Sequence, residues 1–239
     1  MNTQTTVRMT NDPLAPYTLM AELGQVLGNA HRLRIIHLLC QCDRTVEELA
    51  EAMKQPTANV SHHLQLLKKV RILSTRRLGR HIAYGIADDA VRAFWQTYRD
   101  FGTERVVELQ LLAHSLTAQR SKRGGVIDRG SLAALLKTSS VVLIDVRPKE
   151  EYDAGHLPGA ISFPLSQLMQ RISELPRKKT VVLYCRGPYC LLGDAAQEQL
   201  AAKAIAALRL EDGVVDWALA GLPVKKSPGH KNLIERNEP

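Results

Sequence analysis

Residues 45–86 read TVEELAEAMKQPTANVSHHLQLLKKVRILSTRRLGRHIAYGI, and their pattern decides the fold of the first half of the chain. Thr45, with Glu48 three residues on, forms a capping box, which predicts a short helix over VEELAEAM. The KQP segment breaks this helix, and Thr57 is placed to cap a second one, ANVSHHLQLLKKV. The β-favouring runs ILSTRRL and HIAYGI then predict a hairpin. The stretch is therefore expected to form two helices joined by a tight turn, followed by a β-hairpin.

The second helix of this pair has an apolar and a polar face. Val60, Leu64 and Leu67 recur at helical spacing and are expected to be buried. A helix of this width enters the major groove of DNA, where polar side chains donate to base edges or phosphates. The candidate DNA contacts on this helix are Thr57, Asn59, Ser61, His62, His63, Gln65 and Lys69.

The distribution of charge points to the same stretch. The chain has 32 Lys+Arg and 24 Asp+Glu, a net charge of +8. Between Glu51 and Asp88, seven lysines and arginines occur without one carboxylate, which indicates a polyanionic partner. The arginines of the hairpin are expected beside the DNA backbone or minor groove, where their charge displaces counterions. These are Arg76, Arg77 and Arg80.

Helical periodicity continues on both sides of this stretch. Residues 16–28 and 29–41 carry apolar residues at three- and four-residue spacing, and a long amphipathic helix is predicted from about Asp88 to Thr117. Residues 119–126, QRSKRGGV, combine charges with two glycines and are predicted to be a linker.

The hydrophobic pattern of the sequence changes beyond the predicted linker. SVVLIDV (140–146) and TVVLYC (180–185) are continuous apolar runs, typical of strands buried on both faces. Helices are predicted over LSQLMQRISEL (165–175) and LLGDAAQEQLAAK (191–203). Strands that alternate with helices predict an α/β domain with a parallel sheet.

Cys185 ends the second of these strands, just before a predicted helix. Backbone amides and the helix dipole stabilise a thiolate at such a place, so Cys185 is expected to be more acidic than Cys190. A phosphatase or arsenate reductase of similar chemistry needs an arginine six residues after its cysteine, but Leu191 stands there. A loop of this length favours one sulfur atom over a phosphate.

The stretch from Asn29 to Ile86 resembles the ArsR-type family of bacterial repressors. The matching segments are NAHRLRIIHLL, TVEELAEAM, TANVSHHLQLLKK and RRLGRHIAYGI. The resemblance implies a winged helix-turn-helix, mainly α-helical with the hairpin as its wing. It also implies a homodimer built on the first and last helices, which binds a palindromic double-stranded operator and releases it on a chemical signal.

The sequence leaves the nature of that signal open. Many members of the family sense metal through a cysteine motif at the position that Thr45 to Glu47 occupy here, without a thiol. Cys40 and Cys42 lie slightly earlier, but two thiolates do not close a tetrahedral site, so no metal or cofactor is expected. Three hypotheses remain for this pair: an inert buried cysteine, a thiol sensor of sulfur or redox state, and a metalloid site.

The second half resembles the rhodanese family in four ordered motifs. These are DVRPKEEY (145–152), GHLPGA (155–160), YCRG (184–187) and DGVVDWALAGLPV (212–224). The resemblance implies that Cys185 takes sulfane sulfur from a donor such as thiosulfate, polysulfide or a persulfide and passes it to a thiol or cyanide. Arg186 would attract an anionic donor, and Asp145 and Arg147 would brace the loop. Cys190 is either a resolving thiol or a small packed side chain.

The whole chain is thus expected to hold two domains, residues 1–118 and 127–226, with a flexible tail at 227–239. It has no apolar run of about 18 residues and no secretory signal pattern, so a cytoplasmic location is expected. The main hypothesis is a repressor whose rhodanese domain binds or transfers sulfane sulfur through a persulfide. Two alternatives stay open: a sulfurtransferase with a dimerising helical half, and a metalloid-responsive repressor with an idle rhodanese domain.

Overall fold

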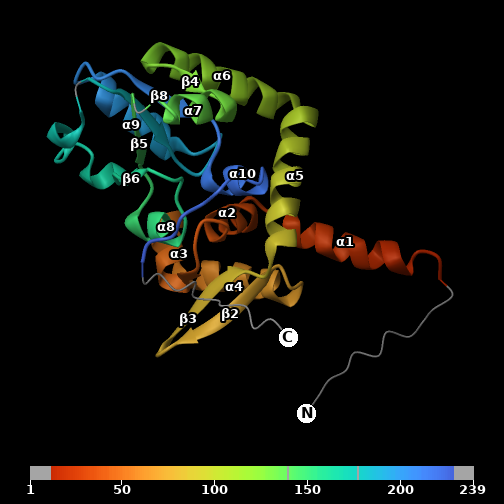
Figure 1. The fold of residues 1–239 in the computed structure, drawn as a ribbon. Helices are drawn as coiled ribbons and strands as arrows, with labels where there is room; N and C mark the ends of the chain where they lie inside the picture. Colours follow the sequence, from red (N-terminus) through yellow and green to blue (C-terminus); the bar gives the residue numbers. More distant parts are fainter. Residues whose placement is uncertain (1–11, 139, 177, 229–239) are drawn as a thin grey trace.

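The computed structural model describes residues 12–138, 140–176 and 178–228, in two halves (Figure 1). The predicted tail lies outside these ranges apart from Ser227 and Pro228. We call residues 12–123 the helical half and residues 126–228 the α/β half. None of the helices in the described ranges is long and apolar enough to cross a membrane.

The helical half begins as a winged helix-turn-helix. A three-stranded antiparallel sheet, in the order β1-β3-β2, stands beside four helices. This confirms the predicted pair of helices and the hairpin. The elements are α1 (Ala15–Leu27), α2 (Ala30–Leu39), β1 (Arg44–Thr45), α3 (Val46–Met53), α4 (Thr57–Lys69), β2 (Leu73–Leu78) and β3 (His81–Ile86).

The start of α3 follows the capping box. The Thr45 amide donates to Glu48 Oε2 at 2.7 Å, and the Glu48 amide donates to Thr45 Oγ1 at 3.3 Å. After α3, Lys54 takes a left-handed conformation with φ of 54°, which turns the chain toward α4.

The prediction that Thr57 caps α4 is wrong. Pro56 is the N-cap residue, and Thr57 is the first residue of the helix. The carbonyl of Pro56 accepts hydrogen bonds from the amides of Asn59 and Val60, at 3.0 and 3.2 Å, so the helix starts one residue earlier than expected. Val60, Leu64 and Leu67 are buried, as their spacing predicts.

Two helices replace the single long helix predicted over 88–117. They are α5 (Asp89–Arg105) and α6 (Val107–Arg123), and Val106 between them is extended, with φ of −98° and ψ of 111°. The break turns α6 onto α9 while α5 packs on α10, so tertiary packing overrides the continuous periodicity. Residues 119–123 of the predicted linker are helical because α6 continues to Arg123, and only two glycines then separate it from the next strand.

The α/β half is built on the predicted parallel sheet. Its five strands lie in the order β4-β8-β7-β5-β6, and every pairing is parallel. Alternate residues of the central strands face two cores, one under α9 and one under α7 and α10. The elements are β4 (Val126–Ile127), α7 (Arg129–Leu136), β5 (Val141–Asp145), α8 (Lys149–Ala154), β6 (Ile161–Ser162), β7 (Thr180–Tyr184), α9 (Leu191–Ala201), β8 (Ala207–Leu210) and α10 (Val214–Leu219).

The α-helix predicted over 165–175 does not form. The segment holds two short 3-10 helices, Leu165–Gln167 and Ile172–Glu174, between Pro164 and Pro176. Leu168 and Leu175 are buried against the sheet, and the short turns between the two prolines bring both inward.

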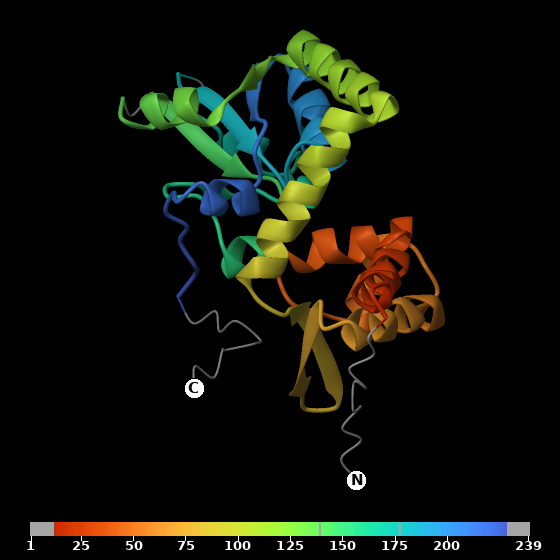
Figure 2. The same ribbon diagram turned by 90° about the vertical axis from the view of Figure 1, so that its right-hand side faces the viewer.

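The two halves pack directly against each other. Figure 2 shows α5 running from the winged helix to the α/β half. Val215 of α10 packs against the core of the helical half. The carboxyl end of β7, where Cys185 lies, is therefore close to residues of both halves.

Candidate functional site

Residues 185–190, which we call the cysteine loop, connect β7 to α9. Cys185 directly follows β7 and is 1% exposed, and Cys190 is the N-cap residue of α9. The Cys185 thiol points back into the loop and donates to the carbonyl of Cys190 at 3.5 Å. Both predicted cysteines thus belong to one tight turn at the carboxyl end of a parallel strand.

The expectation that Cys185 is the more acidic thiol is wrong. Burial raises the pKa of Cys185 well above its ordinary value. A hydrogen bond from the Cys185 thiol lowers the pKa of Cys190 to about 6, and the nearby Arg186 guanidinium adds to this effect. As the donor to the Cys190 carbonyl, the Cys185 sulfur carries its proton in this structure. Transfer of that proton to Cys190 would leave Cys185 as a nucleophilic thiolate.

Arg186 is already engaged by a buried carboxylate. Its guanidinium makes a bidentate contact with Glu151 at 2.6 to 3.0 Å, and Arg44 of the helical half contacts the same carboxylate. Burial alone would raise the pKa of Glu151, but Arg186, Arg147 and Arg44 outweigh it and hold that pKa below its ordinary value. Arg186 is therefore not a free cation for a donor anion; it links the cysteine loop to the helical half.

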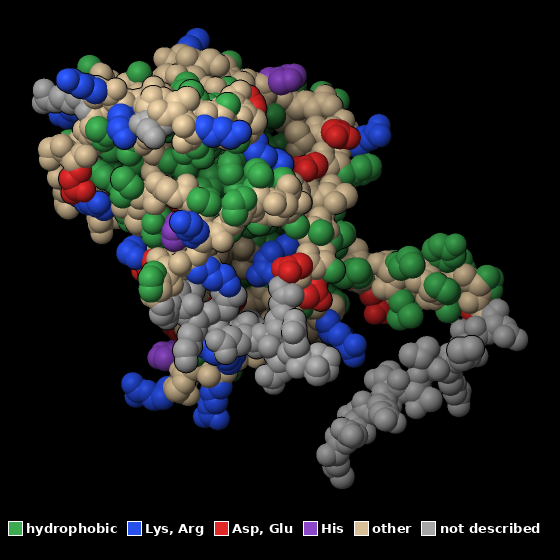
Figure 3. All heavy atoms as spheres, viewed as in Figure 1, with side chains coloured by type: hydrophobic (Ala, Val, Ile, Leu, Met, Phe, Trp, Pro, Cys, Tyr) green, Lys and Arg blue, Asp and Glu red, His purple; other side chains and the backbone are tan. Residues whose placement is uncertain are grey.

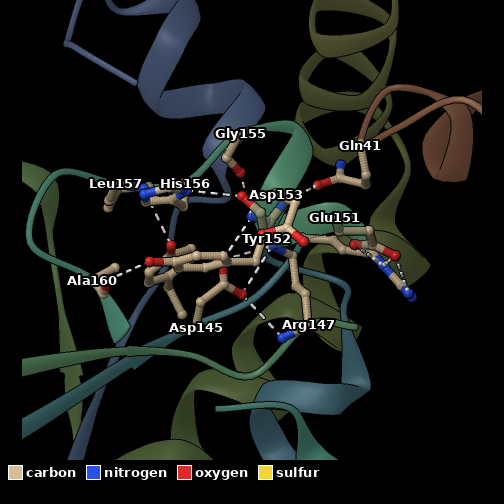
Figure 4. Close-up of polar contacts among 12 residues, drawn as sticks. Gln41, Asp145, Arg147, Glu151, Tyr152, Asp153, Gly155, His156, Leu157 and Ala160 are labelled. Carbon is tan, nitrogen blue, oxygen red and sulfur yellow. Dashed lines mark hydrogen bonds and ion pairs between the residues drawn. The ribbon is translucent and has the colours of Figure 1, made fainter. Parts of the chain in front are cut away.

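Asp145 and Arg147 lie at the end of the neighbouring strand β5. Figure 4 shows Arg147 between Asp145 and Gln41. Its guanidinium donates to Asp145 at 2.6 Å, to the Gly155 carbonyl at 2.6 Å and to Gln41 Oε1 at 3.1 Å. These contacts fasten the segment after α8 to the helical half, and among the described residues none of them reaches the cysteine loop.

Arg209 is the residue that sequence reasoning missed. It is fully buried on β8, and its Nη2 donates to Cys185 Sγ at 3.4 Å, to the Gly187 carbonyl at 3.2 Å and to the Cys190 carbonyl at 2.7 Å. Arg209 also contacts the carboxylate of Asp194 on α9. The available signal was a single charged residue inside the apolar strand ALRL, where only a buried partner can satisfy it.

The helical half also contacts the cysteine loop through α5 and α6. Arg120 of α6 donates to the Pro188 carbonyl at 2.7 Å, and Thr103 of α5 hydrogen-bonds the Tyr189 hydroxyl at 2.7 Å. A cavity of about 310 Å³ beside Pro188 and Tyr189 is lined by both halves. The loop is therefore enclosed by the helical half as well as by its own sheet.

Comparison with known proteins gives both halves a family. Residues 29–75 match the family described as "Bacterial regulatory protein, arsR family", and residues 128–220 match the rhodanese-like domain. The Mycobacterium tuberculosis protein "HTH-type transcriptional regulator Rv0324" is 35% identical over 205 residues, which cover 86% of this chain and 89% of that protein. The chain belongs to the arsR family of bacterial regulators and carries a rhodanese-like domain.

Other similar proteins match one half of the chain each. A "Sulfurtransferase" of Allochromatium vinosum is 34% identical over 105 residues, which cover 43% of this chain and 96% of that protein. The solution structure of the homodimeric winged helix-turn-helix DNA-binding domain of Mb0332 from Mycobacterium bovis is 29% identical. The match covers 41% of this chain and 92% of the Mb0332 chain, with a TM-score of 0.39.

Most of the predicted DNA contacts of this arsR-family regulator are exposed. Three of the ten candidates are less exposed. One is His63, whose ring stacks on His31 of α2 at 5.6 Å between centroids and whose Nδ1 is buried. Arg76 and Ser61 are half-buried. Figure 3 shows basic side chains at the tip of the β2–β3 hairpin. We call the exposed candidates the DNA face: Thr57, Asn59, His62, Gln65, Lys69, Arg77 and Arg80.

Cys40 is the C-cap residue of α2, and Cys42 follows two residues later. Cys40 is part of the helical core, and Cys42 is half-buried. Burial raises the pKa of both thiols to about 12, so both are protonated at neutral pH. This disfavours the thiol-sensor hypothesis, because thiolates are the reactive form. In the described part of the chain, no cluster of three or more His, Cys, Asp or Glu side chains could hold a metal ion.

Proposed function

We propose that this regulator is a cytoplasmic, homodimeric repressor that releases its operator DNA when Cys185 carries a sulfane sulfur. The observation that carries the proposal is the link from Arg186 through Glu151 to Arg44. Arg44 directly precedes Thr45, the N-cap residue of α3, which is the first helix of the DNA-binding pair. The chemistry of the cysteine loop therefore has a short path to the DNA-binding helices.

The sulfur step would take place on Cys185. Its thiolate attacks the outer sulfur of thiosulfate, a new S–S bond forms, the bond inside thiosulfate breaks, and sulfite leaves with the electron pair. The product is a persulfide anion, and cyanide or a thiol can then remove its terminal sulfur. We assign Cys190, the N-cap residue of α9 at the end of the same loop, as the acceptor of the Cys185 proton in this step.

Loading would change the forces on Arg186. The persulfide adds one atom and holds a negative charge in a loop that is closed by hydrogen bonds and buried. This charge competes with Glu151 for Arg186, and a weaker Arg186–Glu151 contact leaves Glu151 to Arg44 alone. A shift of Arg44 is transmitted to α3 through the peptide that joins it to Thr45.

Exposed apolar side chains support the dimer. Leu14, the N-cap residue of α1, and Tyr17 and Met20 within α1 are 64 to 67% exposed, and Phe101 of α5 is 60% exposed. Figure 3 shows apolar side chains along the projecting α1. Exposed apolar surfaces of this kind mark sites of protein association. The first helix and the last helix of the winged helix-turn-helix are also the elements on which the family resemblance implies a dimer.

The proposal has two separable tests. The purified chain should retard DNA from upstream of its own gene at low salt, and incubation with thiosulfate or polysulfide should add ~32 Da to the Cys185 peptide. If it binds no such DNA, the repressor hypothesis fails. A protein that loads and turns over sulfur but ignores DNA would instead be a sulfurtransferase with a dimerising helical half. A chain that never gains sulfur carries a rhodanese-like domain without transfer chemistry.

A further inference from the structure

We infer that Arg209 is a catalytic residue that holds the sulfur anion formed on Cys185, and that Arg120 of the helical half positions Arg209 through Asp194. This inference rests on the proposed sulfur chemistry and adds two residues to it. Three side chains from β8, α9 and α6 form the connection: Arg209 contacts Cys185 Sγ, Asp194 contacts Arg209, and Arg120 contacts Asp194.

Arg209 is placed to bind an anion at the sulfur. Its Nη2 lies 3.4 Å from Cys185 Sγ, and the guanidinium is fully buried. Its Nε is buried and has no hydrogen-bond partner among the described residues. A Cβ added to Gly193 would lie 3.0 Å from both Arg209 Nε and Cys185 Sγ, so the absence of a side chain there lets cation and sulfur share one space. A buried donor without an acceptor is costly unless an anion occupies that space.

The charges of the connected side chains also require an anion. Arg209 and Arg120 are both cationic, and Asp194 supplies the single carboxylate between them. Arg209 is 0%, Arg120 3% and Asp194 8% exposed, so this net positive charge is buried. A counter-charge stabilises a buried excess charge, and Cys185 Sγ, 3.4 Å from Arg209 Nη2, can supply one as a thiolate or a persulfide anion.

Arg120 connects the helical half to Arg209 through Asp194. Its Nε and Nη2 donate to the two oxygens of Asp194 at 2.7 and 3.1 Å, and Nη2 also donates to the Pro188 carbonyl. A displacement of α6 would therefore move Asp194 and the cysteine loop together. Arg120 acts on the sulfur only through Asp194 and Arg209, so it is a positioning residue.

The test measures how fast Cys185 is alkylated by iodoacetamide as pH varies, in the full-length chain and resolved by peptide mass. The charged and titratable groups that face Cys185 are Cys190 and Arg186 on its own loop and Arg209 on β8, with Asp194 behind Arg209 on α9. A Cys190→Ala background removes the shared proton, so the profile reports Cys185 alone. Alkylation needs no sulfur donor, so this test is independent of sulfur loading.

In that background, Arg209→Met should shift the profile upward by about one pKa unit, or about tenfold slower alkylation at a fixed pH below the pKa. Arg209→Lys keeps the charge and should restore most of the rate. Arg120→Gln should give a smaller shift in the same direction. Arg123→Gln, a partly exposed arginine of the same helix whose partner is Glu198 at 3.7 Å, should change nothing.

A folded Arg209→Met variant with an unchanged profile overturns the inference, whether or not the wild type loads sulfur. Thermal unfolding checks that the variant is folded. If it is not, Arg120→Gln decides: an unshifted profile overturns the inference, and an upward shift supports it. A wild type that never loads sulfur, combined with a shifted Arg209→Met profile, rejects the proposed function and keeps Arg209 as the thiolate partner.

Discussion

The two halves of this regulator hold their functional residues in opposite ways. The DNA face consists of exposed side chains on one helix and one hairpin, whereas the cysteine loop is enclosed by buried arginines and carboxylates from both halves. An exposed face acts through the partner that it meets. The reactivity of the cysteine loop is set by protein side chains that contact it. Some of these come from the helical half, so this reactivity depends on how the two halves pack together.

The junction shows a second difference between the halves. Among the described residues, three ion pairs with largely buried side chains cross it, and in each the arginine comes from the helical half and the carboxylate from the α/β half. They are Arg44–Glu151, Arg99–Asp216 and Arg120–Asp194. The basic excess of the helical half therefore serves two surfaces, the DNA face and the junction. Buried pairs add little net stability but penalise a wrong arrangement strongly.

The largest expected effect tests the enclosed half. Cys185→Ala should abolish the ~32 Da gain with thiosulfate or polysulfide, because no other thiol lies on Arg209. Cys190→Ala should still load sulfur, and its persulfide should live longer if Cys190 resolves it. Peptide mass spectrometry measures both. Loading of the Cys185→Ala protein at Cys190 would show that the more acidic thiol is the nucleophile.

Glu151→Gln should be the most destabilising change at the junction. It leaves Arg186 and Arg44 without their carboxylate, which should cost about 3 kcal/mol of the free energy of unfolding. Chemical denaturation measures this, with the exposed neighbour Glu150→Gln as control. An equal stability of both variants would mean that the junction is not held by charge.

The same pair predicts how stability depends on pH. The folded state lowers the pKa of Glu151, so its contribution is complete above the unfolded-state pKa and is lost as pH falls through the lower folded value. Wild-type stability should therefore fall below about pH 4 more steeply than that of Glu151→Gln. If the stability of the two proteins depended on pH in the same way, Glu151 would not contribute to the pH dependence.

A smaller effect is expected on the exposed half. Changing Arg76, Arg77 and Arg80 together to Ala should weaken binding to all DNA sequences by roughly tenfold or more, and should reduce the slope of log affinity against log salt by about 3. Lys122→Ala, an exposed cation on α6, is the control. An unchanged salt slope would mean that the hairpin does not touch phosphates.

The smallest effect concerns the choice of sequence. His62→Ala or Gln65→Ala should reduce the preference for the operator over unrelated DNA by about 1 kcal/mol and leave non-specific binding nearly unchanged. Competition binding with both DNAs measures it. A uniform loss on both DNAs would assign these side chains to the backbone instead of to bases.

The sequence predicted what local rules control. Helical spacing correctly predicted that Val60 is buried and Gln65 is exposed, and the apolar β-branched runs correctly predicted β5 and β7. It could not predict the break at Val106, because packing of α6 on α9 causes it.

The sequence also could not predict which of the two thiols, Cys185 or Cys190, has the lower pKa. It depends on a hydrogen bond and on arginines brought together from distant parts of the chain. Arg209 stayed hidden for the same reason: it lies 24 residues after Cys185 and acts from a neighbouring strand.

One measurement tests the central claim that the enclosed half controls the exposed one. Operator affinity should be measured on one wild-type sample with Cys185 reduced, then persulfidated by thiosulfate or polysulfide, then stripped by cyanide. The account predicts at least about tenfold weaker binding after loading, a typical size for coupling between sites, full recovery after cyanide, and no response in Cys185→Ser. Equal affinity in all three states, with loading verified by mass, would contradict it.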